Sequence, residues 1–299
     1  MKTFSPEDIE PILLGDNQFF GVNHLSPEKG RFMEERFKDV SEIKKIMYYA
    51  LDNGVRGIFF STHPSIYQIT DMMRSDATLK KMSIYVNIPY ISKYVRMLSE
   101  KGMVNTVKTM LLGKKGIAPK LGLLVRSGLS LVSGNYLEIA NRLIDIEMGP
   151  FYDLNVKAIF LHDALTGLVL GYDMINVIRD FHDYISRHYR VIPGFGTLNY
   201  PLMANILEQA NIKQALVMCA VNKKGYFMNP TKSACEEAFG RHFHTILAMS
   251  TLAAGSIKPD EAYEYIASLG TVRHIVVGVS SKEHANETFR IARKYFAKE

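Results

Sequence analysis

Short runs of apolar residues recur along the chain. Each is followed by a polar or glycine-rich turn and then by a longer segment with helical spacing. The runs are Pro11–Gly15, Gly57–Phe60, Ser83–Ile88, Ala158–Leu161, Val191–Pro193, Ala215–Cys219, Thr245–Met249 and His274–Gly278. Short runs that are apolar throughout are typical of parallel strands buried on both faces. The pattern therefore predicts eight parallel strands.

Helical patterns lie between these runs. They cover Val40–Asp52, Gly171–His188, Pro201–Ala210, Lys232–Phe239, Pro259–Ser268 and Lys282–Ala297. Pro201 and Pro259 stand where the first turn of a helix tolerates proline. Alternating strands and helices in a chain of 299 residues predict a single α/β domain over 1–299, a (β/α)8 TIM barrel. An open doubly wound sheet is the main rival.

The interval between the third and fourth strands is too long for one helix and two turns. We therefore predict a helical insertion over 95–150. Part of it is strongly basic: no acid occurs between Glu100 and Glu138, and the cations there are Lys101, Lys108, Lys114, Lys115, Lys120 and Arg126. The insertion is interpreted either as a helical excursion packed on the barrel wall, or as a lid, or as a contact between subunits of a homo-oligomer through 101–135. Attachment to a membrane surface is a further alternative.

Composition narrows the class of protein. The apolar fraction of 47% and the charged fraction of 22% are those of an ordinary soluble globular chain. The two cysteines, Cys219 and Cys235, form no CxxC motif, which excludes a disulfide scaffold and fits a cytoplasmic location. The start of the chain does not resemble a signal peptide. No run approaches the roughly 20 apolar residues of a membrane span.

The net charge of +6 is accounted for by the six cations of the basic segment, so the rest of the chain is formally neutral. Nucleic-acid-binding surfaces usually combine basic with aromatic side chains. Residues 101–135 contain no Phe, Tyr or Trp. We therefore expect a small-molecule substrate and no nucleic-acid partner.

Chemistry in such barrels lies at the C-terminal ends of the strands. The polar residues that follow the apolar runs are therefore the candidate catalytic residues: Asn17, His63, Tyr67, Asn87, His162 and Asp163, with Asp16 and His24 close by. We expect His162, Asp163, Asn17, His63 and Asn87 to converge on one pocket. A buried structural histidine is the alternative for His162, and ordinary turn chemistry is the alternative for Asp16.

The segment after the eighth strand predicts an anion site. Gly278, Ser280, Ser281 and Lys282 combine backbone N–H groups at a helix start, two hydroxyls and an ammonium group. Ser281 can also act as an ordinary helix N-cap, and the two roles are compatible.

Several segments resemble the aldo/keto reductases, NADPH-dependent (β/α)8 oxidoreductases. The similar segments are ILLGDNQFFG, AIFLHDAL, IPGFGTLNYP, AVNKKG, ILAMSTLAAG and IVVGVSSKEHANET. The resemblance covers strands four to eight best, about half of the chain. The resemblance implies that His162 faces the substrate and that Thr197 and Asn199 replace the family's Ser-Asn pair. It also places Asn222 in the strand-six region and Ser280–Lys282 at the phosphate of NADP.

Two members of that family's catalytic set of Asp, Tyr, Lys and His are replaced here. The strand-two segment IFFSTHPSIY has no Asp, and Tyr67 lies six residues after Ser61. The third strand carries Asn87 or Pro89 where the family has Lys. Because an unperturbed phenol has a pKa of ~10, Tyr67 without a lysine is a poor acid at neutral pH.

The leading functional expectation is an oxidoreductase-like enzyme that uses NADP to reduce a small carbonyl compound. His162 would orient or protonate the carbonyl oxygen, with Tyr67 as the acid. The second expectation is a lyase, isomerase or hydrolase at the same barrel mouth, dependent on a divalent metal or on acid/base groups. Its residues would be His24, His63, His162, Asp16 and Asp163, types that suit zinc or manganese. The third is a degenerate, non-catalytic barrel.

Overall fold

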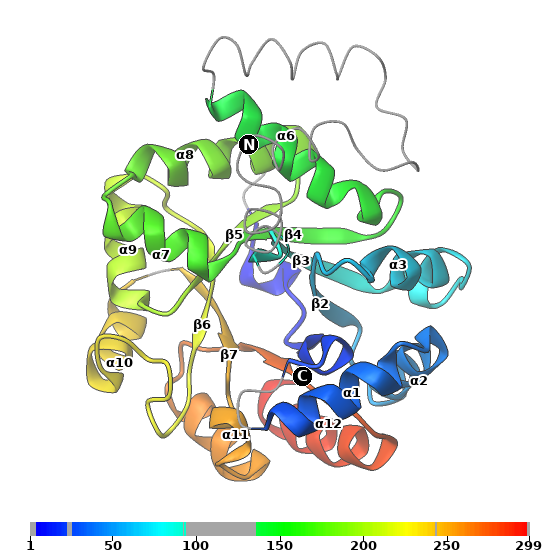
Figure 1. The fold of residues 1–299 in the computed structure, drawn as a ribbon. Coiled ribbons are helices and arrows are strands. Elements are labelled where there is room, and N and C mark those ends of the chain that lie inside the picture. Colours follow the sequence, from blue (N-terminus) through cyan, green and yellow to red (C-terminus); the bar gives the residue numbers. More distant parts are fainter. Residues whose placement is uncertain (1–3, 23–25, 92, 94–135, 243, 298–299) are drawn as a thin grey trace, which may run out of the picture.

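The computed structural model describes residues 4–22, 26–91, 93, 136–242 and 244–297. Eight parallel strands close into a barrel in sequence order, and helices surround it (Figure 1). The strands are β1 (Ile12–Leu14), β2 (Gly57–Ser61), β3 (Ser83–Ile88), β4 (Val156–Leu161), β5 (Ile192–Thr197), β6 (Leu216–Ala220), β7 (Thr245–Met249) and β8 (His274–Val277). The predicted (β/α)8 barrel is confirmed, and the open sheet is excluded because β1 pairs with β8.

Alternate residues of each strand face the barrel interior and the helix layer. The interior cluster contains Leu13, Phe59, Tyr85, Phe160, Leu216, Met218 and Leu247. Their neighbours in sequence, such as Ile58, Val86 and Ile159, belong to the larger core between strands and helices. Both faces are therefore apolar, which is why each strand reads as an unbroken apolar run.

The helix layer also follows the sequence pattern closely. Its helices are α1 (Pro27–Phe37), α2 (Val40–Asp52), α3 (Ile66–Arg74), α6 (Tyr136–Met148), α7 (Asp163–Gly171), α8 (Ile175–Tyr184), α9 (Tyr200–Gln209), α10 (Lys232–Arg241), α11 (Pro259–Ser268) and α12 (Lys282–Phe296). The helix expected over Gly171–His188 begins later, at Ile175, and α8 is continued by a π-helix over Ile185–Tyr189. α7 ends at Gly171, and Asp173 adopts a left-handed φ of 55° before α8 begins.

β5 extends four residues beyond the predicted end at Pro193. Its glycines, which usually weaken a strand, are required here by packing. A Cβ atom on Gly194 would lie 2.5 Å from Cδ1 of Phe160, inside the barrel. Glycine at this position therefore makes room for an aromatic ring on the neighbouring strand β4.

The insertion predicted over 95–150 lies largely outside the described residues, apart from α6 and the turn after it. Its basic segment and the proposed subunit contact through 101–135 are outside them as well. The division of the chain into one domain stays a prediction. Among the described residues, no helix combines the length and apolar character needed to cross a membrane.

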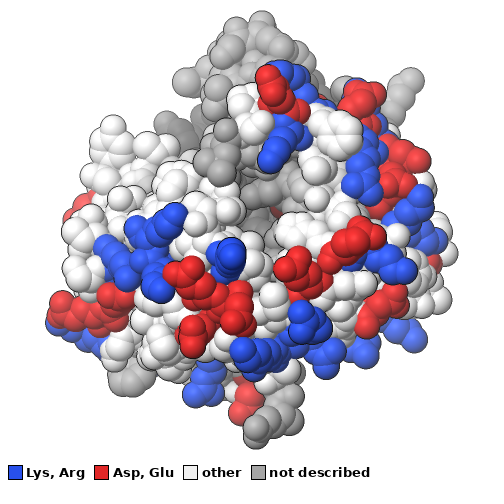
Figure 2. Space-filling model, turned by 90° about the horizontal axis from the view of Figure 1, so that it is seen from below, with Lys and Arg blue, Asp and Glu red and all other residues white. Residues whose placement is uncertain are grey.

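Charged side chains of both signs are interspersed on the face shown in Figure 2. Many pair locally, for example Lys45 with Glu42 at 2.5 Å and Lys223 with Glu261 at 2.8 Å. A mixed surface of this kind agrees with the formal neutrality of the chain outside its basic segment.

Candidate active site at the barrel mouth

Three polar side chains continue the inward-facing rows of the barrel at the C-terminal ends of β2, β3 and β4. Ser61, Asn87 and His162 each stand two residues after an interior residue, namely Phe59, Tyr85 and Phe160. Ser61 and Asn87 are register partners, and the backbone N–H of His162 donates to the carbonyl of Ile88 over 2.8 Å. The alternation of side chains along a strand therefore brings all three to the inner face of the mouth.

His162 is held through one ring nitrogen. It is the N-cap of α7, and its Nδ1 accepts a hydrogen bond from the backbone N–H of Ala164 over 3.2 Å. Oδ1 of Asp163 lies 2.9 Å from the same nitrogen. Burial acts to raise the pKa of the Asp163 carboxyl, but the contact with His162 outweighs it and the pKa is lowered. Nδ1 accepts from Ala164 when it carries no proton and pairs with Asp163 when it carries one. In the first state the proton of the neutral ring is on Nε2, which is the ring atom that can meet a ligand.

Asn87 carries a buried polar atom that has no partner. Only 5% of its surface is exposed, and its Oδ1 makes no hydrogen bond within the described part of the chain. Buried polar atoms in folded proteins are almost always paired, and exceptions occur at sites that await a ligand or water. This amide is therefore suited to bind a polar group that enters the mouth.

Asp16 is the buried neighbour of Ser61 at the mouth. Its carboxyl is 3% exposed, and Oδ2 accepts a hydrogen bond from the backbone N–H of Ser61 over 2.6 Å. The Ser61 side chain also acts on this carboxyl and favours its ionised form. Burial raises the pKa of Asp16 to about 6, although these hydrogen bonds act in the opposite direction. The carboxyl thus changes its charge close to neutral pH.

Tyr67 stands in a setting that disfavours proton donation. Its side chain is half-exposed on α3, and burial, together with the negative charge of Glu147, raises the pKa of its phenol above the ordinary value. Glu147 itself is buried at the end of α6, where Thr62 donates to it and Lys93 pairs with it at 2.6 Å. This Thr62–Glu147–Lys93 cluster was missed from the sequence, because Glu147 is 85 residues from Thr62 and 54 from Lys93.

His63 and Asn17 are placed differently from the three inward residues. The His63 ring stacks on Phe20, with centroids 4.2 Å apart, and meets Tyr90 edge to face at 5.0 Å. Its Nδ1 accepts from the backbone N–H of Ser65. Asn17 is exposed at the start of the short 3-10 helix η2 (Asn17–Phe20). Convergence of all five residues on one pocket stays a prediction, as does the role of His24, which lies outside the described residues.

The expected anion site has an N-terminal helix turn with a hydroxyl cap. Oγ of Ser281 accepts from the backbone N–H of His284 over 3.1 Å, at the start of α12. Lys282 is exposed, with its ammonium 6.0 Å from the centroid of the Tyr49 ring. Arg36, which the sequence did not indicate, donates to the carbonyl of Ser280 over 2.6 Å and pairs with Glu42.

Gly278 is exposed beside this turn, where a Cβ atom would lie 2.7 Å from Oε1 of Gln18. Gln18 also donates to the carbonyl of Gly15 over 2.6 Å. Gln18 is therefore bonded to the end of β1 and lies close to the end of β8.

The other candidate cofactor residues have local partners. Thr197 is buried, and its hydroxyl accepts from the backbone N–H of Asn199 over 3.0 Å. Asn199 in turn caps α9 through the N–H of Leu202. Asn222 is fully buried and uses both amide atoms on the backbone of Tyr226, each at 2.8 Å. These residues shape the loops after β5 and β6, and a cofactor role for them stays a prediction.

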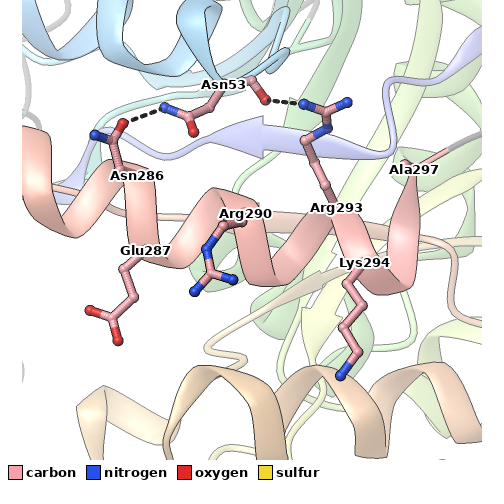
Figure 3. Close-up of a pocket in the computed structure, with 7 residues that line it drawn as sticks. All are labelled: Asn53, Asn286, Glu287, Arg290, Arg293, Lys294 and Ala297. Atoms are coloured by element: carbon pink, nitrogen blue, oxygen red, sulfur yellow. Dashed lines mark hydrogen bonds between the residues drawn. The ribbon is translucent and has the colours of Figure 1, made fainter.

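One pocket of about 520 Å³ lies away from the strand ends, between α2 and α12 (Figure 3). Two of its three cationic side chains have structural partners. Arg293 donates to the carbonyl of Asn53, and Lys294 pairs with Asp260 at 3.2 Å. Within the described ranges, no group of three or more His, Cys, Asp or Glu side chains is arranged to hold a metal ion.

The fold is shared with solved structures, two of which are described as putative aldo-keto reductases. A structure described as "the putative aldo-keto reductase from Pseudomona aeruginosa" aligns with a TM-score of 0.58 and 14% identity, over 95% of this chain and 90% of that one. A second, similarly described, aligns with a TM-score of 0.59 and 12% identity over the same shares, 95% and 90%. A third, "Gox0644 at apoform", aligns with a TM-score of 0.53 and 9% identity over 97% and 87%.

No protein-family model matches the sequence, and no curated protein matches it. The chain therefore has an aldo/keto-reductase-like (β/α)8 fold, and its chemistry has to be argued from its own residues.

Proposed function

We propose that this protein is an oxidoreductase that uses NADP to reduce a small carbonyl compound at the barrel mouth. The observation that carries the proposal is the fixation of His162 through Nδ1 at the end of β4. An imidazole held in this way can present an Nε2–H group to a carbonyl oxygen, where negative charge develops during reduction. Preorganised donors at such a position are a major source of rate enhancement.

The orphaned Oδ1 of Asn87 supports a polar substrate. This atom accepts hydrogen bonds and donates none. A carbonyl compound that also carries a hydroxyl group would satisfy it, whereas a purely apolar aldehyde would leave it unpaired. The proposal therefore favours hydroxylated carbonyl substrates.

The residues at the start of α12 fit an anionic cofactor. The first-turn N–H groups, the Ser281 hydroxyl and the exposed Lys282 ammonium suit a phosphate group. When bound, NADPH would supply the hydride. The part that falls to this chain is to hold the phosphate, to orient the carbonyl and to deliver a proton.

The test combines cofactor binding with turnover. NADPH and NADH are titrated separately, and oxidation of NADPH is followed with glyceraldehyde as the probe substrate. We expect Lys282→Ala to weaken NADPH binding by roughly 1.5–3 kcal/mol, the worth of a charge-assisted hydrogen bond, with a smaller effect on NADH. His162→Ala should lower kcat/KM by about 10²–10³-fold, while the exposed His188→Ala serves as the matched control.

Binding of neither nucleotide at millimolar concentration would remove the cofactor half of the proposal. Turnover that survives His162→Ala unchanged would remove the role of His162. The second candidate function is acid/base chemistry without a redox cofactor, and the buried, titratable Asp16 carboxyl is the observation that favours it.

A further inference from the structure

Carbonyl reduction requires a proton donor, and the donor expected from the sequence is poorly placed. Burial and Glu147 both raise the pKa of Tyr67. The described residues bring no lysine to the end of β3, where Asn87 stands instead. A group other than Tyr67 therefore has to release the proton, while His162 orients the carbonyl oxygen from the end of β4.

We infer that Asp16 and Ser61 form the proton-donating couple of this mouth, with the Ser61 hydroxyl facing the ligand and the Asp16 carboxyl behind it as the proton reservoir. The inference rests on the proposed function. Its geometry comes from two adjacent strand ends: Oδ2 of Asp16, after β1, lies 2.6 Å from the backbone nitrogen of Ser61, the last residue of β2. The side chain of Ser61 acts on the same carboxyl, lowering its pKa.

The two residues of the couple differ in how far solvent can reach them. Asp16 is buried, whereas Ser61 is partly exposed and belongs to the inward row of β2. Its register partner is Asn87, whose unpaired Oδ1 marks the same part of the mouth as a place for a polar ligand. A ligand oxygen beside Asn87 is therefore on the side of Ser61 that faces away from Asp16.

The proton balance of the step is complete. The carbonyl carbon gains a hydride from the reduced nicotinamide cofactor, and the carbonyl oxygen gains the proton that leaves Oγ of Ser61. Asp16 gives its own proton to Oγ and becomes a carboxylate, which water protonates again after product release. The net change is one carbonyl, one NADPH and one proton converted into an alcohol and NADP⁺.

The charge state of Asp16 is set locally. The pKa depends on burial and on hydrogen bonds from Ser61 and from the backbone of Asp16 itself. Titratable side chains on described neighbouring elements include His63 beyond β2, Glu34 and Arg36 on α1, and Lys282 on α12, and none of these four is among the causes. Burial keeps a proton on the carboxyl up to a pKa of about 6, within the range where a general acid is effective.

The first measurement needs no turnover. The Asp16 carboxyl is followed by carbon-13 NMR across pH, in the full-length wild type and in Ser61→Ala. We expect a midpoint near 6 in the wild type. In Ser61→Ala the midpoint should rise, because the serine hydroxyl stabilises the ionised form. The matched control Ser65→Ala, on the exposed turn after β2, should leave it unchanged. A wild-type midpoint at the ordinary value of 3.8 would overturn the inference.

The second measurement is the pH dependence of glyceraldehyde reduction by NADPH. We expect the rate to be constant below about pH 6 and to fall about tenfold per pH unit above it, since only protonated Asp16 can donate. Asp16→Asn should lower kcat by about 10²-fold or more and flatten the profile, whereas the exposed Asp52→Asn should retain both.

The two proposals fail separately. Turnover with an unchanged rate and profile in Asp16→Asn and Ser61→Ala overturns the couple and leaves the reductase standing. Absence of NADPH binding, with Asp16 titrating near 6 and responding to Ser61→Ala, overturns the reductase. In that case Asp16 and Ser61 remain an acid/base pair, and the carbon-13 signal of the Asp16 carboxyl detects that pair without turnover.

Discussion

At the residue scale, Asp16 shows how burial and hydrogen bonding compete for one charge. The carboxyl receives hydrogen bonds from Ser61 that favour its ionised form, yet its pKa is raised because almost all of its water has been removed. The pKa of Tyr67 is also raised, by burial and by the charge of Glu147, but the consequence for function is the opposite. A raised pKa makes a carboxyl a usable acid near neutral pH and makes a phenol a worse one.

The raised pKa of Asp16 predicts a pH-dependent cost to stability. The folded protein holds the proton more tightly than the unfolded chain does. The free energy of unfolding therefore falls as pH rises from 3.8 through about 6. Once Asp16 is fully ionised in both states, the difference between these two pKa values has lowered the free energy of unfolding by about 3 kcal/mol. Asp16→Asn cannot ionise and keeps an oxygen that can accept from Ser61.

We expect the stability of Asp16→Asn relative to the wild type to increase by up to about 3 kcal/mol between about pH 4 and pH 7. Urea denaturation of both proteins at the two pH values measures it, with Asp52→Asn as the control. A difference that does not change with pH would show that Asp16 is not a buried, titrating group.

At the element scale, the close contact between β4 and β5 depends on a glycine. Phe160 fills the barrel interior, and its ring occupies the space that a side chain on Gly194 would need. Apolar residues before and after the glycine keep β5 buried, so the strand continues past the predicted end at Pro193.

We therefore expect Gly194→Ala to lower the free energy of unfolding by about 1–3 kcal/mol through overpacking. The matched control is Gly167→Ala in α7, where nothing lies within 4 Å of the added atom. Alanine should stabilise that helix by up to about 1 kcal/mol. Chemical denaturation of the three proteins tests both signs, and equal effects at the two positions would rule out the steric explanation.

At the scale of the whole molecule, closure of the sheet makes each strand depend on two neighbours. β1 pairs with both β2 and β8, so no strand of the barrel is an edge. Loss of one strand would expose the backbone hydrogen-bonding groups of two others. The barrel is therefore expected to unfold as one unit, which is also what a single domain over 1–299 implies.

The chain has no tryptophan and 16 tyrosines, so tyrosine emission reports on tertiary structure around the barrel. We expect this signal and far-ultraviolet circular dichroism to give the same urea midpoint. Gly194→Ala should move the two midpoints together. Separate transitions for the two signals would argue for independently unfolding parts and against one domain.

The sequence by itself determined the alternation of the fold and the approximate position of each strand, although β5 ends four residues later than predicted. Apolar runs such as Ser83–Ile88 and helices such as Pro259–Ser268 match the structure at both bounds, because burial on two faces and helical spacing are local patterns. His162 and Asn87 were found for the same reason, since each follows directly in the inward row of its strand.

Only the tertiary structure decided which of these residues meet. Asp16 contacts Ser61 across 45 residues, and Thr62 contacts Glu147 across 85. Such contacts depend on the register between strands and on how a helix packs outside them. Neither can be predicted from the spacing of apolar residues within one element. The pKa of Asp16 has the same origin, because it depends on water excluded by side chains from distant parts of the chain.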